Sequence, residues 1–211
     1  VPTDDAAVIG SGMLVRSEDK ADSDGLLRAM LPDAVQYREH YTPITTHIIG
    51  TNEMARRAVA DEGAHQQLDC HLHETFINGD AVEQGRRLGQ YLHDAPVGVH
   101  VWGGETTVKL PDKPGLGGRN QALALSLAAA VDGIEDVSVL VAGSDGIDGN
   151  TPCAGAVVSG HSMRSIRQMG FDVELELNKA NAGTVLMASG DLFKPGPTNT
   201  NVMDLIIAYK R

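Results

Sequence analysis

Cysteine is scarce in this sequence and long apolar runs are missing, and each scarcity excludes a class of protein. The two cysteines, Cys70 and Cys153, share no CxxC spacing, so a disulfide framework is not expected and a reducing compartment is favoured. No apolar stretch approaches the roughly 20 residues that a membrane span needs. The longest one, residues 122–131, is predicted to be a buried helix. Residues 1–5 are acidic where a signal peptide is cationic, so we expect a cytoplasmic protein.

Basic residues are also in the minority. The chain has 17 Lys and Arg against 28 Asp and Glu, a formal net charge of −11 and a pI near 5.0. Nucleic acids and anionic membranes need a basic footprint, so neither is expected as a partner. A small anion can still bind where backbone N–H groups and a few Arg or Lys residues supply positive potential. Hydrophobic residues make up 42% of the 211, which is enough for a sizeable core in one or two domains.

Strand and helix patterns alternate along most of the chain. Residues 1–45 have no strong periodic apolar face and read as a connecting arm, the remnant of an upstream domain, with a short helix at 22–31. Residues 46–211 are predicted to form a three-layer α/β/α domain with a mixed sheet. The predicted strands are 46–49, 68–76, 97–102, 106–110 and 137–142. The predicted helices are 53–63, with Met54, Ala58 and Val59 on its apolar face, 81–93 and 119–131.

Four polar loops are the candidates for chemistry, because ligands in open α/β sheets collect at strand ends. In the first loop, Gly103 and Gly104 follow a strand and have no Cβ, so a ligand can approach the backbone closely. Glu105 and Thr106 would then present a carboxylate and a hydroxyl. The alternative is a tight turn with a solvated glutamate.

The second loop, residues 115–121, is rich in glycine and leads into a helix. The unpaired N–H groups and the positive dipole of a helix N-terminus attract anions. Arg119 in the first turn opposes that dipole, and a bidentate grip on phosphate or carboxylate would explain its position. The glycine spacing matches neither a P-loop nor a dinucleotide fingerprint. The alternative is a surface loop with a solvated arginine.

The third and fourth loops are residues 144–150 and 196–201. Two Asp-Gly pairs turn the third sharply, but Ile147 and Gly149 stand where calcium would need oxygen ligands. Mg²⁺ held by one or two carboxylates with a substrate phosphate fits better, and consecutive turns are the alternative. The short polar side chains of the fourth loop could cap a helix or bind a ligand.

The histidines do not predict a metal centre. His65, His71 and His73 lie near one another in the sequence, but no carboxylate or cysteine pattern completes a zinc site. They are expected to be solvated residues at helix or strand ends. The sequence also has no G-x-S-x-G nucleophile motif.

Taken in order, these segments resemble a known family. Trp102-Gly-Gly-Glu-Thr-Thr, Gly117-Gly-Arg-Asn-Gln, Ser144-Asp-Gly-Ile-Asp-Gly with Ala154-Gly-Ala, and the run from Gly196 to Asp204 are similar to the MOFRL domain, here about residues 97–205. The resemblance extends to Ile49-Gly-Thr-Asn and, more faintly, to Val8-Ile-Gly-Ser-Gly. This domain belongs to the glycerate 2-kinase family, whose members are also named hydroxypyruvate reductase. The resemblance implies the C-terminal half of a two-domain kinase fold.

The resemblance also implies a reaction, the ATP-dependent phosphorylation of D-glycerate. ATP and Mg²⁺ are the implied cofactors, with the nucleotide site mostly in an N-terminal half. Arg119, Glu105 and Asp145 are the implied catalytic residues, and no metal ligand is assigned. The implied substrate-binding residues are Asn52, Gly103, Gly104, Thr106, Gly118, Asn120, Asp148, Thr198, Thr200 and Asn201.

This chain departs from the family in three places. The N-terminal half, with its Gly-rich nucleotide segment and catalytic lysine, has no counterpart here. The turn near Gly10 lacks its Pro-Thr, and residues 178–183 differ from the usual segment. We therefore expect the chain alone to be inactive, and to work beside an N-terminal half or as a homo-oligomer. The alternatives are a stand-alone domain that binds small anions or regulates without catalysis and, less favoured because the dinucleotide fingerprint is missing, a hydroxypyruvate reductase.

Overall fold

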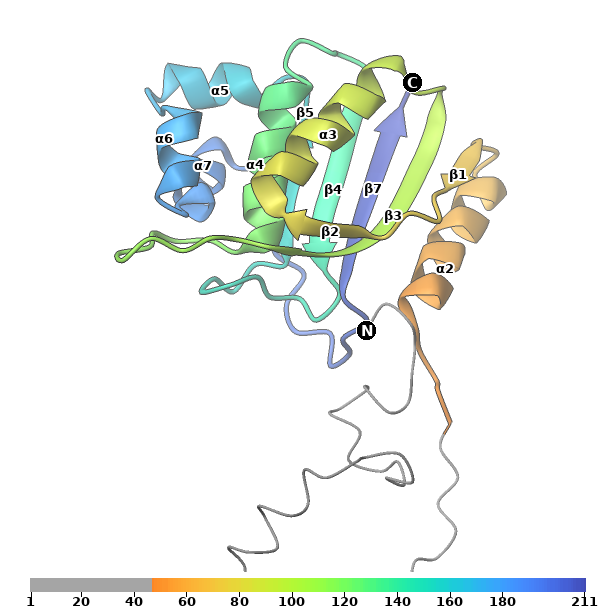
Figure 1. The fold of residues 1–211 in the computed structure, drawn as a ribbon. Helices are drawn as coiled ribbons and strands as arrows, with labels where there is room; N and C mark the ends of the chain where they lie inside the picture. Colours follow the sequence, from red (N-terminus) through yellow and green to blue (C-terminus); the bar gives the residue numbers. More distant parts are fainter. Residues whose placement is uncertain (1–46) are drawn as a thin grey trace, which may run out of the picture. The chain divides into compact units, whose positions relative to one another are not determined.

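The computed structural model describes residues 47–211, which form helices around one seven-stranded sheet (Figure 1). The arm predicted for residues 1–45, with its helix at 22–31 and the Val8–Gly12 segment, lies outside the described residues. The strands are β1 (Cys70–Leu72), β2 (Ile77–Asp80), β3 (Gly98–Thr107), β4 (Val137–Gly143), β5 (Gly155–Ser159), β6 (Leu192–Phe193) and β7 (Asp204–Lys210). The helices are α2 (Asn52–His65), α3 (Ala81–Asp94), α4 (Arg119–Ala130), α5 (Ser162–Gln168), α6 (Val173–Asn178) and α7 (Ala182–Ser189).

The sheet is mixed, as predicted. Its order is β1-β3-β7-β4-β5-β6, and β2 also pairs with β3. β1 and β2 run parallel to β3, whereas every pair that involves β7, β4, β5 or β6 is antiparallel. The last strand of the chain, β7, lies between β3 and β4, so the ends of β3 and β4 meet the start of β7 at one edge of the sheet.

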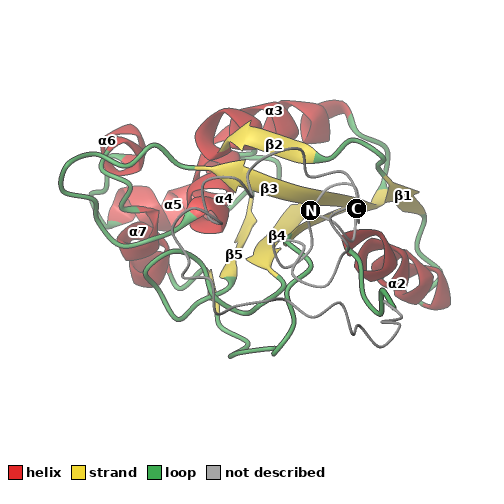
Figure 2. Ribbon diagram, turned by 60° about the horizontal axis from the view of Figure 1, so that its bottom comes forward, coloured by secondary structure: helices red, strands yellow, loops and turns green. Residues whose placement is uncertain are grey.

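Helices cover both faces of this sheet, which confirms the three-layer prediction. α3 and α4 lie side by side on one face, and α2 packs on the other face against β1, β3 and β7 (Figure 2). α5, α6 and α7 lie beside α4, towards β5 and β6. No helix in the described part of the chain is long and apolar enough to cross a membrane.

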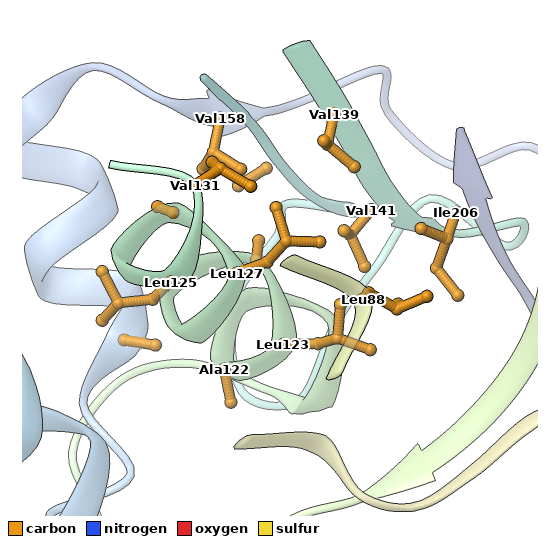
Figure 3. Close-up of a cluster of buried hydrophobic side chains, with 14 of the residues drawn as sticks. Leu88, Ala122, Leu123, Leu125, Leu127, Val131, Val139, Val141, Val158 and Ile206 are labelled. Atoms are coloured by element: carbon orange, nitrogen blue, oxygen red, sulfur yellow. The ribbon is translucent and has the colours of Figure 1, made fainter. Parts of the chain in front are cut away.

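The core lies between α4 and the sheet. α4 is buried along most of its length because α3, the sheet and α6–α7 surround it, and this burial accounts for its uniform Ala and Leu composition. Leu127 points towards Val141 of β4 (Figure 3), and Val139 and Val141 alternate with more exposed residues, as period-two burial requires. Each such side chain contributes roughly 1.5–3 kcal/mol relative to exposure.

Glycines let α3 approach α4 closely. A Cβ on Gly85 would stand 2.6 Å from the carbonyl oxygen of Leu123, and one on Gly89 would stand 2.3 Å from the Cβ of Ala130. Neither space is large enough for a methyl group. The two helices therefore contact each other through backbone as well as side chains, which fixes the position of α4 on the sheet.

Several predicted elements match the structure. The helices at 81–93 and 119–131 are α3 and α4, and the strand at 137–142 is β4. The helix at 53–63 is α2, but its predicted apolar face was wrong: Met54 is 53% exposed and Ala58 is exposed. The face turned inward carries Asn52 and Gly63: Asn52 lies against Gly103 of β3, and Gly63 leaves room for the side chains of Cys70 and Val99.

The strand boundaries needed more correction. The predicted strands at 97–102 and 106–110 are one continuous strand, β3, which runs through Gly103 and Gly104 and ends at Thr107. Residues 47–49 are not a strand, and the strand predicted at 68–76 is reduced to β1. β2 was not predicted, because its sequence, Ile-Asn-Gly-Asp, carries turn residues instead of an apolar pattern.

Candidate functional site

The candidate site lies at the edge of the sheet where three strands meet. Asp204, the first residue of β7, pairs with Gly104 of β3 on one side and Gly143 of β4 on the other. The N-terminus of α4, which begins at Arg119, lies at the same edge, at the bottom of the view in Figure 1. The loops after β3 and β4 and the loop before β7 therefore converge on one place.

Arg119 and Asp204 form the central contact. The Nε and Nη2 of Arg119 donate to the two carboxylate oxygens of Asp204 at 2.6 and 3.0 Å, and Asn120 Nδ2 donates to the same carboxylate at 3.0 Å. The Asp204 side chain is 3% exposed, whereas that of Arg119 is 36% exposed. This hydrogen bonding raises the pKa of Arg119 above its usual value, so its charge is permanent. Glu105 lies 4.0 Å from Arg119 Nη2.

Asp148 caps the N-terminus of α4 from a different loop. Its carboxylate oxygens accept the backbone N–H groups of Asn120 and Gln121 at 3.1 and 2.9 Å. Burial raises the pKa of Asp148 to about 6, although these two N–H bonds lower it. Two of the helix N–H groups that the sequence predicted to be free for an anion, those of Asn120 and Gln121, are therefore occupied by the chain's own carboxylate.

The glycines predicted to let a ligand approach the backbone are likewise in contact with other parts of the protein. A Cβ on Gly103 would overlap the Asn52 side chain, one on Gly104 would stand 2.8 Å from the Ile77 carbonyl oxygen, and one on Gly118 would stand 2.3 Å from Asp148 Oδ1. These glycines admit neighbouring segments of the protein to the backbone. The packing of the fold alone therefore explains why these positions need glycine.

A pocket of about 470 Å³ opens beside this network. Its polar side carries the hydroxyl-bearing Thr106, the backbone of Gly118, and the side chains of Arg119 and Asp148. Its apolar side is formed by Val108, Leu110, Pro114, Ala122, Leu177, Ala180 and Ala182. Thr106 is 3% exposed, and its Oγ1 has no hydrogen-bond partner within residues 47–211. A buried hydroxyl without a partner beside a pocket is a natural contact for a ligand.

The structure thus brings together part of the predicted site. Thr106, Gly118, Arg119 and Asp148 line the pocket, and Glu105 is adjacent to Arg119. Asn120 is buried, where it contacts Asp204 instead of the pocket.

The other predicted residues hold the neighbouring loops. Asn201 Nδ2 donates to Asp145 Oδ2 at 3.3 Å, and the backbone N–H of Thr198 donates to the Asp145 carbonyl. The backbone N–H of Thr200 donates to the hydroxyl of Thr198. Asn52 Nδ2 donates to the carbonyl oxygens of Val202 and Asp204 at 2.8 and 3.0 Å. These residues hydrogen-bond within the loops around the site, and none of them lines the pocket.

Asp204 itself was not among the predicted site residues, although it ends the last motif segment. In the sequence, Asp204 is an acidic residue immediately before an apolar run. This position fits the first residue of a strand and the last residue of a polar loop equally well, so it did not single out Asp204. Asn150 was also missed: its Oδ1 accepts Gly117 N–H at 2.8 Å and its Nδ2 donates to Gly115 O at 3.1 Å, so it shapes the Gly-rich loop.

Three histidines, His71, His73 and His100, form a stacked cluster, and none of them lines the pocket. His73 stacks on Trp102 with a ring-centroid distance of 4.2 Å, and its Nε2 lies 3.1 Å from His100 Nδ1. Burial, together with the neighbouring His100 and His71, lowers the pKa of His73 to about 4. His73 is therefore a neutral, half-buried residue and not a solvated one. Residues 47–211 contain no group of three or more His, Cys, Asp or Glu side chains arranged to hold a metal ion.

Comparison with known proteins gives consistent matches. A D-glycerate 2-kinase of Thermotoga maritima is 34% identical over 193 residues, which cover 88% of this chain and 45% of that protein. A glycerate 2-kinase of Pyrococcus horikoshii is 32% identical, covering 81% of this chain and 40% of the relative. A crystal structure of glycerate kinase from T. maritima superposes with a TM-score of 0.85 at 31% identity, covering all of this chain and 55% of the other.

The chain spans about half the length of the curated relatives it matches, and it corresponds to their C-terminal part. The MOFRL family model matches residues 98–204, from the first residue of β3 to the first residue of β7. That range includes Arg119, Asp148 and Asp204, the residues around which the site is built. The chain belongs to the MOFRL family.

Proposed function

We propose that this chain supplies the substrate-binding part of a glycerate kinase that transfers a phosphoryl group from ATP to D-glycerate. The observation that carries the proposal is the arginine at the pocket: Arg119, fixed by Asp204, lines a 470 Å³ pocket with Thr106 and Asp148. The relatives named glycerate 2-kinase support the choice of reaction and substrate. Phosphoryl transfer depends mainly on positioning and charge neutralisation, which such a site can provide.

Arg119 has the central role in this proposal. Its partly exposed guanidinium would bind the glycerate carboxylate or the charge that develops on the transferred phosphoryl group. Thr106 would donate its unpaired hydroxyl to the substrate. Glu105 and Asp145 carry carboxylates that are less buried than those of Asp148 and Asp204, so they are the candidates to accept the proton of the attacking hydroxyl.

Magnesium is part of the proposal because the local charge is negative. Asp204, Asp148 and Glu105 surround the single guanidinium of Arg119, and a nucleotide would add further negative charge. Both oxygens of Asp148 and of Asp204 already accept hydrogen bonds. Glu105, which is exposed, would therefore hold the ion together with substrate phosphates, as Mg²⁺ usually binds. Asp145 would join it only by releasing the hydrogen bonds that it accepts from Ile147 N–H and Asn201 Nδ2. When bound, the ion would neutralise phosphate charge.

The residues around the pocket do not form a recognisable nucleotide site. The pocket walls offer neither a P-loop nor a dinucleotide fingerprint. We propose that an N-terminal half, or another chain that replaces it, provides most of the ATP site, and that residues 1–211 alone do not turn over.

The test is an assay of ADP formation that requires D-glycerate, on the protein isolated from its native cells with any associated chain. We expect activity in that assembly and none in residues 1–211 alone. Replacing Arg119 by Ala should lower kcat/KM by at least about tenfold, as expected for loss of a charged contact. Asp132→Asn, which disrupts an ion pair with Arg167, is the matched control, because neither residue lines the pocket. D-glycerate binding without turnover in the native assembly would favour a binding domain, and NADH oxidation with hydroxypyruvate would favour a reductase.

A further inference from the structure

Asp204 is a buried carboxylate that contacts the side chain on which the proposed function depends. It accepts hydrogen bonds from Arg119 Nε and Nη2 and from Asn120 Nδ2. Its own carbonyl oxygen accepts from Asn52 Nδ2 at 3.0 Å, and its backbone lies between β3 and β4. The strand pairing and three neighbouring side chains therefore fix the position of this carboxylate.

The contact occupies only one side of the guanidinium. A guanidinium carries five N–H donors, and an acid can take either the Nε–Nη2 edge or the Nη1–Nη2 edge. Asp204 takes the Nε–Nη2 edge. Among the described residues no hydrogen bond is made to Nη1, and Arg119 lines the pocket. The second edge therefore remains for an anionic ligand.

We infer that Asp204 is a positioning residue, which fixes Arg119 so that its second edge serves the ligand. An arginine side chain has many rotamers, and a guanidinium already fixed by a buried acid loses less conformational entropy on binding. Without the Asp204 charge, Glu105, 4.0 Å from Nη2, becomes the nearest competing carboxylate, and a contact with it would turn the free edge away. Asp204 itself does not line the pocket. The inference rests on the proposed function, because it names D-glycerate as the ligand.

A double-mutant cycle tests this role. The dissociation constant for D-glycerate is measured by calorimetry for the wild type, Asp204→Asn, Arg119→Ala and the double variant. We expect Asp204→Asn to weaken binding about tenfold in the wild-type background, equivalent to ~1.4 kcal/mol. In the Arg119→Ala background the same change should alter binding less than about twofold. Equal weakening in both backgrounds would mean that Asp204 acts on the fold in general, and the inference would fail.

A second readout does not depend on glycerate binding. The NMR signal of the Arg119 Nε–H group should shift in Asp204→Asn and remain unchanged in Asp132→Asn, which instead alters the signal of Arg167. An unchanged Arg119 signal in the Asp204 variant would overturn the inference whether or not glycerate binds. Absence of glycerate binding by the wild type, with the expected signal shift, would count against the proposed function alone. If Asp204→Asn does not fold, Asp204→Glu retains the charge and displaces it by one methylene, and the same shift is expected.

Discussion

The cap on α4 makes a quantitative prediction about stability and pH. Asp148 ionises with a pKa of about 6 in the folded protein, against 3.8 when unperturbed, because it is buried. Between these values the folded chain holds a proton that the unfolded chain has released. The free energy of unfolding therefore falls as pH rises from about 4 to 6 and is level above that range, as far as this group is concerned. One pKa unit corresponds to about 1.4 kcal/mol.

The perturbation that isolates this effect is Asp148→Asn. Asparagine does not titrate, and its Oδ1 can accept only part of what the carboxylate accepts from the backbone of Asn120 and Gln121. At pH 7.5 the loss of those bonds and the removal of a buried charge oppose each other, so we predict the change with pH, not the absolute value. The stability of the wild type relative to Asp148→Asn should rise by about 2 kcal/mol between pH 7.5 and pH 4.5.

Urea unfolding at five or six pH values, followed by circular dichroism on both proteins, measures this difference. Other titrating groups, His73 included, are common to both proteins and cancel. A difference that stays constant with pH would show that the hydrogen bonds to Asp148 fully offset its burial. In that case the raised pKa is wrong, and so is the picture of α4 capped by a carboxylate that is costly to ionise.

Three further predictions concern packing, the histidine cluster and the pocket. Gly89→Ala should destabilise the protein by about 1–3 kcal/mol, because its Cβ would stand 2.3 Å from the Cβ of Ala130, whereas Gln90→Ala on the exposed side of the same helix should change little in thermal unfolding. His73→Phe retains ring stacking but does not titrate. Because the pKa of His73 is lowered in the folded protein, the unfolding free energy of the wild type should fall by about 1–2 kcal/mol relative to this variant as pH falls from about 6.5 to 4, after allowance for solvent screening. Stability curves that stay parallel over this pH range would contradict the lowered pKa. Thr106→Val should leave the unfolding free energy unchanged or raise it by up to about 1 kcal/mol, because the hydroxyl has no partner, while weakening D-glycerate binding in calorimetry; a loss of stability would point to an internal partner for that hydroxyl.

Periodic apolar patterns were sufficient to predict the centre of the fold. α3, α4 and β4 each carry a pattern with one structural interpretation, and all three lie where the sequence placed them. α2 was located correctly but oriented wrongly, since its inward side carries Asn52 and Gly63 and gives no hydrophobic signal. The sequence did not predict β2 or the middle of β3, because Gly79, Gly103 and Gly104 favour turns locally. In the structure, strand pairing overrides this local preference.

The candidate site was only partly predictable, and the reason is a general one. Sequence reasoning found the polar loops, and the structure places Arg119, the residue predicted to bind the anion, where these loops converge. Sequence reasoning could not determine which polar groups form hydrogen bonds with one another. Asp148, predicted to orient substrate or magnesium, holds the N–H groups of α4, and Gly118 admits that carboxylate. Pairing of this kind depends on the approach of loops that are distant in sequence, and a single sequence does not record it.

The internal pairing changes how the motif should be understood. If the glycines and acids of these loops all faced a ligand, the site would be open and strongly acidic, and an anion would be repelled from it. In the structure Asp148 and Asp204 are buried, the first against backbone N–H groups and the second against Arg119 and Asn120. The two carboxylates therefore hold α4 and the Arg119 guanidinium in place. The positive charge of Arg119 is then the main electrostatic feature of the pocket beside an apolar wall, which suits a small anion better than the residue composition suggests.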